Sequence, residues 1–223
     1  IFCALAVAGC KGSEMDKEKW LEEDRIKFLR KIGIRRGQSL LDFGCGSGNY
    51  AIPAAEIVGA EGTIYALDRN RGALDELMRK AEAEGLTNIK RMEASGQLKI
   101  DLEEESIDVV LLYDVLHHYY FPRAGDRGRI LQEVHRVLKP NGFVSFYPGD
   151  PQVYHNYHEL EITERQIENV DFRLASEHSG MLIHEGMLVR GKVLNFRKSH
   201  SIGARPTPRA PETGWKHGES QII

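Results

Sequence analysis

Short apolar runs alternate along the chain with segments whose apolar positions repeat at helical spacing. Four of these runs have the length and composition of buried strands: residues 39–43 (SLLDF), 62–68 (GTIYALD), 88–93 (NIKRME) and 106–114 (SIDVVLLYD). Between them, helical patterns over 50–58 and 71–84 stop at Gly59 and Gly85. This alternation predicts a parallel sheet with helices on both faces.

The pattern continues outside this unit. Further helices are predicted over residues 16–32 and 126–138, and further strands over 143–147, 171–178 and 187–198. The KPNG sequence at 139–142 predicts a turn, because Pro ends a helix and Asn-Gly permits a positive φ. Thr163 with Gln166 forms a capping box that predicts the start of a short helix. The last two strands lack a helix-length connection and should pair antiparallel. The chain is therefore predicted to be an α/β protein with a doubly wound, seven-stranded, mostly parallel sheet and an antiparallel last strand.

The composition indicates a single domain that acts on small molecules. The chain has 223 residues, of which 41% are hydrophobic, enough for one core, and residues 16–198 are the predicted domain. Its formal net charge of -3 gives no electrostatic footprint for nucleic acid. Three cysteines, Cys3, Cys10 and Cys45, are too few for a disulfide framework or a four-ligand zinc site, which favours a reducing, cytoplasmic compartment.

The two ends of the chain lack the alternating pattern. Residues 1–15 begin with an apolar stretch far shorter than the roughly 20 residues that span a bilayer, so no membrane span is predicted. This leader is either mis-started, with Met15 as the start, or the end of a lipobox whose Cys10 would be lipidated. Residues 199–223 combine prolines with glycine and charge, which predicts disorder, with partner binding as the alternative.

A glycine-rich loop joins the strand at 39–43 to the next helix. There, Gly44 can take the positive φ of a tight turn, Gly46 omits a Cβ that would obstruct a ligand, and Gly48 lets helix and strand pack closely. The helix N-terminus presents free N–H groups and the positive end of its dipole. Asp68 ends the second strand about 20 residues later, where a carboxylate can accept from both ribose hydroxyls. Loop and acid together predict a nucleoside cofactor.

NAD is the main alternative ligand, because dinucleotide sites share this geometry. The dinucleotide pattern requires Gly or Ala at position 49, where this chain has Asn49, and the third glycine comes one place early, at Gly48. Asp42, just before the loop, would repel a pyrophosphate and attract a ligand with an amino group and a cationic centre. The loop therefore favours a cationic amino-acid nucleoside.

Four segments, LLDFGCGSGNY, YALD, SIDVVLLYDVLHH and HRVLKPNGFV, resemble in order and spacing the motifs of class I S-adenosylmethionine-dependent methyltransferases. The resemblance covers residues 18–198 and implies a Rossmann-like methyltransferase fold with S-adenosylmethionine as cofactor. It implies that Asp42 and the loop residues Gly44, Cys45, Gly46, Ser47 and Gly48 hold the methionine portion, and that Asp68 takes the ribose. It further places Arg69, Glu93 and Ala94 at the adenine and Tyr113 near the reactive methyl group.

The methyl acceptor determines what the remaining residues must do. A sulfonium methyl group is already activated, so the protein must align a nucleophile with the S–CH₃ bond and exclude water. A general base is needed only where the acceptor loses a proton. His117 and His118 are the candidates, either as base or as lining of the acceptor pocket. Further pocket candidates are Tyr119, Tyr154, His155 and His158.

Two other interpretations of these side chains receive less weight. His155 and His158 with His117 have the residue types of a metal site, but a solvated His-rich loop explains them as well, and no metal is predicted. Cys45 is interpreted as structural, because its small side chain fits the turn. The sequence thus predicts a methyltransferase for a small-molecule acceptor of open identity. An NAD(P)-dependent oxidoreductase and a non-catalytic S-adenosylmethionine-binding or regulatory protein are the alternatives.

Overall fold

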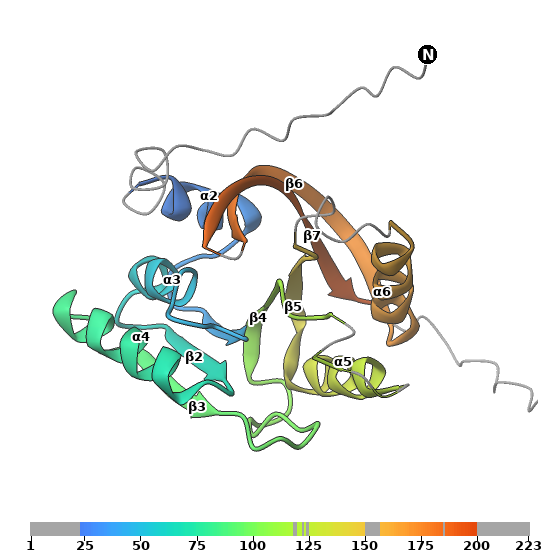
Figure 1. Cartoon of the computed structure of the whole chain (residues 1–223), viewed down its shortest axis with the longest axis horizontal. Coiled ribbons are helices and arrows are strands. Elements are labelled where there is room, and N and C mark those ends of the chain that lie inside the picture. The colour runs from blue at the N-terminus through green and yellow to red at the C-terminus, as the bar shows by residue number, and fades with distance from the viewer. Residues whose placement is uncertain are drawn as a thin grey trace, which may run out of the picture.

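The computed structural model describes residues 23–117, 120–121, 123, 125–149, 157–184 and 186–199 (Figure 1). Its strands are β1 (Ser39–Phe43), β2 (Thr63–Asp68), β3 (Ile89–Glu93), β4 (Ile107–Tyr113), β5 (Leu138–Tyr147), β6 (Phe172–His184) and β7 (Met187–Lys198). Its helices are α2 (Arg25–Ile32), α3 (Ala51–Val58), α4 (Arg71–Ala83), α5 (Asp126–Val137) and α6 (Tyr157–Asn169).

The strands form one seven-stranded sheet in the order β3-β2-β1-β4-β5-β7-β6. The pairs among β1 to β5 are parallel, whereas β7 runs antiparallel to both of its neighbours, β5 and β6. The predicted doubly wound sheet and its antiparallel last strand are therefore confirmed. The order reverses between β1 and β4, and in open α/β sheets ligands bind beyond the carboxyl ends of the strands at such a point.

Two apolar layers cover the sheet, one on each face. Successive residues of a strand point to opposite faces, and Leu40 accordingly packs in the core with α2, α3 and α4, while Leu41 packs in the core with α5 and α6. Val109 and Val110 divide in the same way on β4. Burial on both faces explains why these strands read as continuous apolar runs in the sequence.

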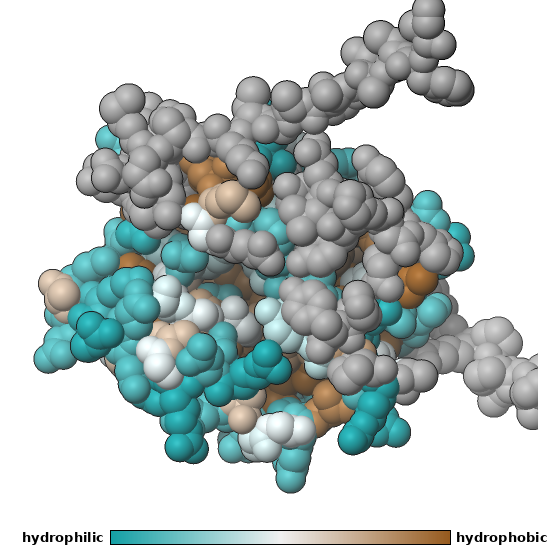
Figure 2. Space-filling model, in the orientation of Figure 1, coloured by the Kyte–Doolittle hydropathy of each residue, from teal (hydrophilic) through white to brown (hydrophobic). Residues whose placement is uncertain are grey.

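The surface over α4 and β3 is mostly hydrophilic, as Figure 2 shows at its lower left. The charged side chains of α4 lie on the face turned away from its buried Leu74, Leu77 and Ala81. Within the part of the chain that the structure describes, no helix combines the length and the apolarity needed to cross a membrane.

The start of β5 differs from the sequence prediction. Residues 139–142, predicted as a turn, belong to β5, where a register shift opposite Ile107 to Val109 accommodates them. The φ angle of Gly142 is not positive, as the predicted turn would require. Its role is close packing, because a Cβ at this position would lie 2.8 Å from the carbonyl oxygen of Asp108. The strand bulges instead of turning.

We expect G142A to lower the free energy of unfolding by about 2 kcal/mol, because the backbone oxygen of Asp108 cannot move aside for the added methyl group. The matched control is G128A, since Gly128 lies within α5 with open space around its Cβ position. That substitution should raise the free energy of unfolding by about 0.5–1 kcal/mol. Urea denaturation of both variants measures the difference, and equal effects would contradict the packing role of Gly142.

The capping prediction at Thr163 is also wrong. Helix α6 begins at Tyr157, so Thr163 lies in its middle. Its side chain is buried and its Oγ1 accepts a hydrogen bond of 3.3 Å from Arg127 of α5. The Thr-x-x-Gln pattern therefore reflects a contact between helices.

The helix predicted over 16–32 is confirmed for α2, which ends at Gly33 with a φ of 117°. Its earlier part, the 1–15 leader and all but residue 199 of the 199–223 tail lie outside the described residues.

Candidate cofactor site and acceptor region

The glycine loop lies between the carboxyl end of β1 and the N-terminus of α3. Gly44, Gly46 and Gly48 all have positive φ, at 81°, 51° and 92°. A Cβ at Gly44 would lie 2.9 Å from Val115, and one at Gly48 would lie 2.9 Å from Leu77 of α4. A Cβ at Gly46 would instead enter open space. The first and third glycines thus serve packing, whereas the second leaves an open approach to the backbone.

Asp68 holds the loop from the neighbouring strand. Its Oδ2 accepts a hydrogen bond of 2.8 Å from the backbone N–H of Gly46, and its Oδ1 accepts one of 2.8 Å from Asn70. The backbone N–H groups of Gly44 and Cys45 also donate to the carbonyl of Leu67 at the end of β2. Each carboxylate oxygen retains acceptor capacity for a further donor, such as a ribose hydroxyl. Asp68 therefore shapes the loop and keeps acceptor capacity beside it.

Asp42 is a buried carboxyl group with an unsatisfied oxygen. Its side chain lies beneath the loop with 2% exposure, the backbone N–H of Ala51 donates to it, and its Oδ2 has no hydrogen-bond partner among the described residues. Burial, reinforced by the negative charge of Asp68, raises the pKa of Asp42 from 3.8 to about 7. An unpaired buried carboxylate is costly, and a cationic ligand group would remove that cost.

The residues expected at the adenine surround the exposed ends of β2 and β3. The guanidinium of Arg69 lies 5.1 Å from the ring centre of Tyr120, which places a cation and an aromatic ring at this rim. Glu93 is exposed and forms ion pairs of 2.8 Å with Arg71 and Arg91, so its carboxylate is engaged by cations in this structure. The backbone N–H of Ala94 donates to the carbonyl of Asp68.

Tyr113 closes β4 beside the loop in an aromatic cluster. Its hydroxyl lies 2.9 Å from Ser145 Oγ, and its ring meets Tyr50 edge to face at 4.8 Å and Tyr147 at 6.1 Å. Tyr50, the N-cap of α3, accepts at its hydroxyl a hydrogen bond of 2.9 Å from the backbone N–H of Ile183. The end of β6 is thereby fixed against the start of α3, directly after the glycine loop, and the sequence pattern did not indicate this contact.

Cys45 is buried within the loop. Burial, together with the charges of Asp42 and Asp68, raises the pKa of its thiol well above the usual range. Its Sγ contacts the carbonyl of Gly46 at 3.6 Å. A thiol held protonated in this way is a poor nucleophile, which agrees with the structural interpretation of this residue.

The segment after β4, predicted to face the methyl acceptor, belongs to a cluster of two histidines and an aspartate. His117 Nε2 lies 2.7 Å from Asp114 Oδ1, and His184 Nδ1 lies 2.6 Å from Asp114 Oδ2. His117 is 8% exposed and His184 is fully buried. Asp114 and His184 were not among the residues singled out from the sequence. The spacing of Asp114 and His117 is a local signal, but the contact of Asp114 with His184, 70 positions apart, depends on the β6–β7 hairpin.

The remaining candidates are only partly covered by the structure. His118, Tyr119, Tyr154 and His155 lie outside the described residues, and His158 lies within the backbone of α6 with no described side chain. The alternative metal site built on His155, His158 and His117 therefore remains a hypothesis. Among the described residues, no group of three or more His, Cys, Asp or Glu side chains is arranged to hold a metal ion.

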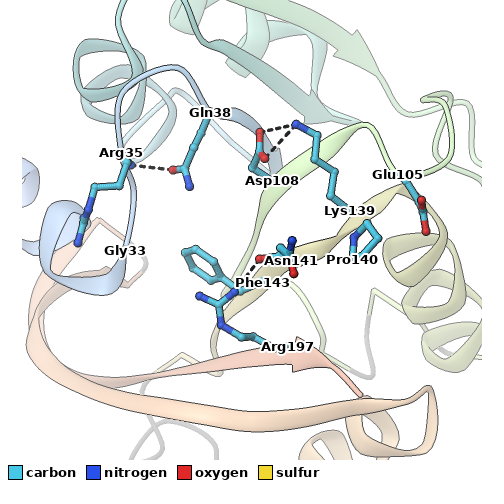
Figure 3. Close-up of a pocket in the computed structure, with 10 residues that line it drawn as sticks. All are labelled: Gly33, Arg35, Gln38, Glu105, Asp108, Lys139, Pro140, Asn141, Phe143 and Arg197. Atoms are coloured by element: carbon cyan, nitrogen blue, oxygen red, sulfur yellow. Dashed lines mark hydrogen bonds and ion pairs between the residues drawn. The ribbon is translucent and has the colours of Figure 1, made fainter. Parts of the chain in front are cut away.

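A pocket of about 600 Å³ lies at the opposite, amino-terminal edge of the strands (Figure 3). Its walls include Asp108 and Lys139, which form an ion pair of 2.9 Å, and Arg197, which donates to the carbonyl of Asn141 at 2.6 Å. Asp108 also accepts from the backbone N–H of Ser39. The polar groups of Asp108, Lys139 and Arg197 have partners within the pocket walls, and none of the residues that line the pocket belongs to the glycine loop.

The sheet order, the open glycine loop and the two aspartates define the class of domain. Residues 41–146 match the family model described as a methyltransferase domain. Just under half of the chain is therefore similar to the methyltransferase-domain family, and S-adenosylmethionine-dependent methyltransferases of solved structure share its fold.

The comparisons also identify particular relatives. The demethylmenaquinone methyltransferase of Geobacillus kaustophilus is 32% identical over 124 residues, which are 56% of this chain and 49% of the relative. That of Lactobacillus johnsonii is 30% identical over 120 residues, or 54% and 47% of the two chains. The chain thus spans about half the length of these curated relatives. An S-adenosylmethionine-dependent methyltransferase structure from Aquifex aeolicus matches with a TM-score of 0.59 and 20% identity, covering 83% of this chain and 99% of that one, which shows a shared fold.

Proposed function

We propose that this protein transfers the methyl group of S-adenosylmethionine to a small-molecule acceptor by in-line displacement. The observation that carries the proposal is the buried, unpartnered Oδ2 of Asp42 beneath a glycine loop that is open at Gly46. The open loop suits a nucleoside ligand, and the buried carboxylate suits an ammonium group and would repel a pyrophosphate. When bound, the cofactor supplies an electrophilic methyl group on a sulfonium.

In this proposal the chain's residues position the two reactants. Asp42 binds the ammonium group, the Gly44–Gly48 backbone borders the methionine portion, and Asp68 accepts hydrogen bonds from the ribose. Arg69 lies at the adenine rim, and Tyr113 packs against the site of transfer beside Tyr50. Such residues raise the rate by holding the acceptor in line with the S–CH₃ bond and by excluding water.

We further propose an aromatic acceptor of the quinol type. The names of the matched relatives, demethylmenaquinone methyltransferases, support this class. A quinone ring is electron-poor and does not attack a methyl electrophile, whereas the two-electron reduced quinol is a nucleophile. The aromatic side chains of Tyr50, Tyr113 and Tyr120 near the loop suit a flat apolar acceptor.

Calorimetry with two ligands separates this function from the oxidoreductase alternative. We expect S-adenosylhomocysteine to bind the purified chain with one-to-one stoichiometry, because it carries the ammonium group and the ribose that Asp42 and Asp68 recognise. NAD should give no binding heat at the same concentrations, since its pyrophosphate would face the carboxylate of Asp42. Tight binding of NAD without binding of S-adenosylhomocysteine would contradict the proposal.

A further inference from the structure

Three side chains from distant parts of the sequence form one hydrogen-bonded line at the segment after β4, which is predicted to face the methyl acceptor. Asp114, directly after β4, is the central member, with one carboxylate oxygen 2.7 Å from His117 and the other 2.6 Å from His184. Both distances are short for hydrogen bonds between a nitrogen and an oxygen, as expected for charge-assisted pairs. The carboxylate side chain is 22% exposed, whereas the His184 side chain has no exposure.

The line lies next to the cofactor loop, as two independent contacts show. Val115, adjacent to Asp114, occupies the space into which a Cβ of Gly44 would point. Ile183, adjacent to His184, donates its backbone N–H to the hydroxyl of Tyr50 at the start of α3. The histidines therefore flank the loop from the segment after β4 and from the end of β6.

The backbone of Asp114 is held in an uncommon conformation. Its φ is 55°, a left-handed value that aspartate tolerates better than most residues. Its N–H still donates to the carbonyl of Tyr147 at 2.8 Å, so the turn is fixed to β5 while the side chain departs toward the two histidines. Backbone strain of this kind concentrates at functional sites.

We propose that His117, Asp114 and His184 form a proton relay that accepts the proton released by the methyl acceptor, which is therefore a protic compound such as a quinol or phenol. This inference rests on the proposed function and specifies its acceptor class. A lone pair of the acceptor forms the bond to the methyl carbon while the C–S bond breaks with its electron pair going to sulfur. The proton of the acceptor passes to the imidazole of His117. Asp114 stabilises the resulting imidazolium, and His184 is a positioning residue that orients Asp114.

Other charged and titratable groups surround the line and must be controlled in a pH experiment. Arg127 of α5 donates to the carbonyl of Leu116, next to His117, and the ring of Tyr120 lies 6.0 Å from that of His117. Tyr113 of β4 directly precedes Asp114, and the negative charge of Asp42 on β1 acts on the hydroxyl of Tyr113. Because Asp42 titrates near pH 7, the relay is measured as kcat at saturating S-adenosylmethionine, where cofactor affinity has no influence.

The first test is spectroscopic and needs no acceptor. In protein labelled with ¹⁵N-histidine, we expect protected imidazole N–H proton resonances for His117 and His184 that are displaced downfield by the charged acceptor. Both should disappear or shift in D114N. The resonance of His178, whose Nε2 lies 2.9 Å from Ser176 Oγ on β6, should remain unchanged as an internal control. Unchanged His117 and His184 resonances in D114N would overturn the relay.

The second test is kinetic and uses D114N, H117Q, H184Q and the control H178Q. The probes are dithionite-reduced demethylmenaquinone, catechol and phenol as protic acceptors, and pyridine and dimethyl sulfide as aprotic ones. With protic acceptors, we expect D114N and H117Q to lower kcat about 100-fold, H184Q about 10-fold and H178Q not at all. The D114N/H117Q double variant should lose no more than either single variant, because the residues act as one unit.

A rise in pH should distinguish a relay from a structural effect. The deficit of D114N should shrink as the pH approaches the pKa of the acceptor hydroxyl, because the acceptor then ionises without help. Unaltered kcat in D114N with a protic acceptor, or wild-type turnover with aprotic acceptors alone, would overturn the relay and leave the proposed function in place. Absence of S-adenosylhomocysteine release from wild type with every probe would instead refute the proposed function itself.

Discussion

Calorimetry on D68A is expected to show S-adenosylhomocysteine binding weakened about 100-fold relative to wild type. The substitution removes two sets of interactions. One is the hydrogen bond that the Asp68 carboxylate accepts from the backbone N–H of Gly46, and the other is the pair of hydrogen bonds that we propose it accepts from the ribose hydroxyls. Two hydrogen bonds to a charged group at about 1.5 kcal/mol each correspond to a change of this size in Kd.

The matched control for D68A is D75N. Asp75 lies on the exposed face of α4 and pairs with Arg91, away from the loop. Its substitution should leave the Kd unchanged, because exposed ion pairs contribute little. A thermal melt of D68A verifies that the fold persists. Equal affinities of D68A and wild type would show that the ligand does not lie against Asp68.

Substitution D42N is expected to stabilise the ligand-free protein while it weakens cofactor binding. The pKa of Asp42 is raised to about 7, so the folded protein holds a proton between about pH 4 and pH 7 that the unfolded chain has already lost. Stability contributed by this group is therefore present at low pH and is lost as the pH rises through 7. The D42N side chain cannot ionise, so the variant should be more stable than wild type at pH 8 but not at pH 4.

The expected gain at pH 8 is about 2 kcal/mol. The rise in the pKa of Asp42 from 3.8 to about 7 corresponds to about 4 kcal/mol of lost folding stability at pH 8. The unpaired amide that asparagine would bury offsets part of the gain from removing this charge. Thermal unfolding at pH 8 should show a rise of several degrees in Tm. A lower Tm of D42N at pH 8 would contradict the raised pKa of this carboxyl group.

The same residue should make cofactor binding dependent on pH. The affinity of wild type for S-adenosylhomocysteine should fall as the pH drops below 7, because protonated Asp42 no longer attracts the ammonium group. D42N should bind more weakly at pH 8 and lose this dependence. 5′-Methylthioadenosine, which lacks the amino-acid portion, is the matched ligand control and should bind wild type and D42N equally. A pH-independent affinity of wild type for S-adenosylhomocysteine would remove Asp42 from the ammonium site.

The sequence predicted those features that depend on local pattern. The strand and helix alternation, the antiparallel end of the sheet and the positive φ of Gly44 follow from burial periodicity and from the properties of glycine. The predicted turn at 139–142 failed because its glycine serves a close approach to Asp108 in a neighbouring strand. The capping box at Thr163 failed for a similar reason, since the side chain bonds Arg127 of another helix. Local motifs do not distinguish such tertiary contacts from turns and caps.

The contact of His184 with Asp114 is another tertiary contact that local sequence patterns did not reveal. His117 was identified because it follows a buried strand end, where sites of open α/β sheets occur. His184 lies in a strand whose length was underestimated, since the prediction ended at 178 and β6 continues to 184. Only the pairing of β6 with β7 brings its imidazole within 2.6 Å of Asp114. A contact set by strand register between distant segments has no signal in a single sequence.

The central claim is methyl transfer, and its most direct test follows the methyl group itself. The purified chain is incubated with methyl-labelled S-adenosylmethionine and dithionite-reduced demethylmenaquinone, with catechol and phenol in parallel, and the products are separated by chromatography and mass spectrometry. We predict that label appears in at least one acceptor in equal amount to the S-adenosylhomocysteine formed, and that D68A lowers both when S-adenosylmethionine is below saturation. Binding of S-adenosylhomocysteine without label in any acceptor would contradict the account and favour a non-catalytic cofactor-binding protein.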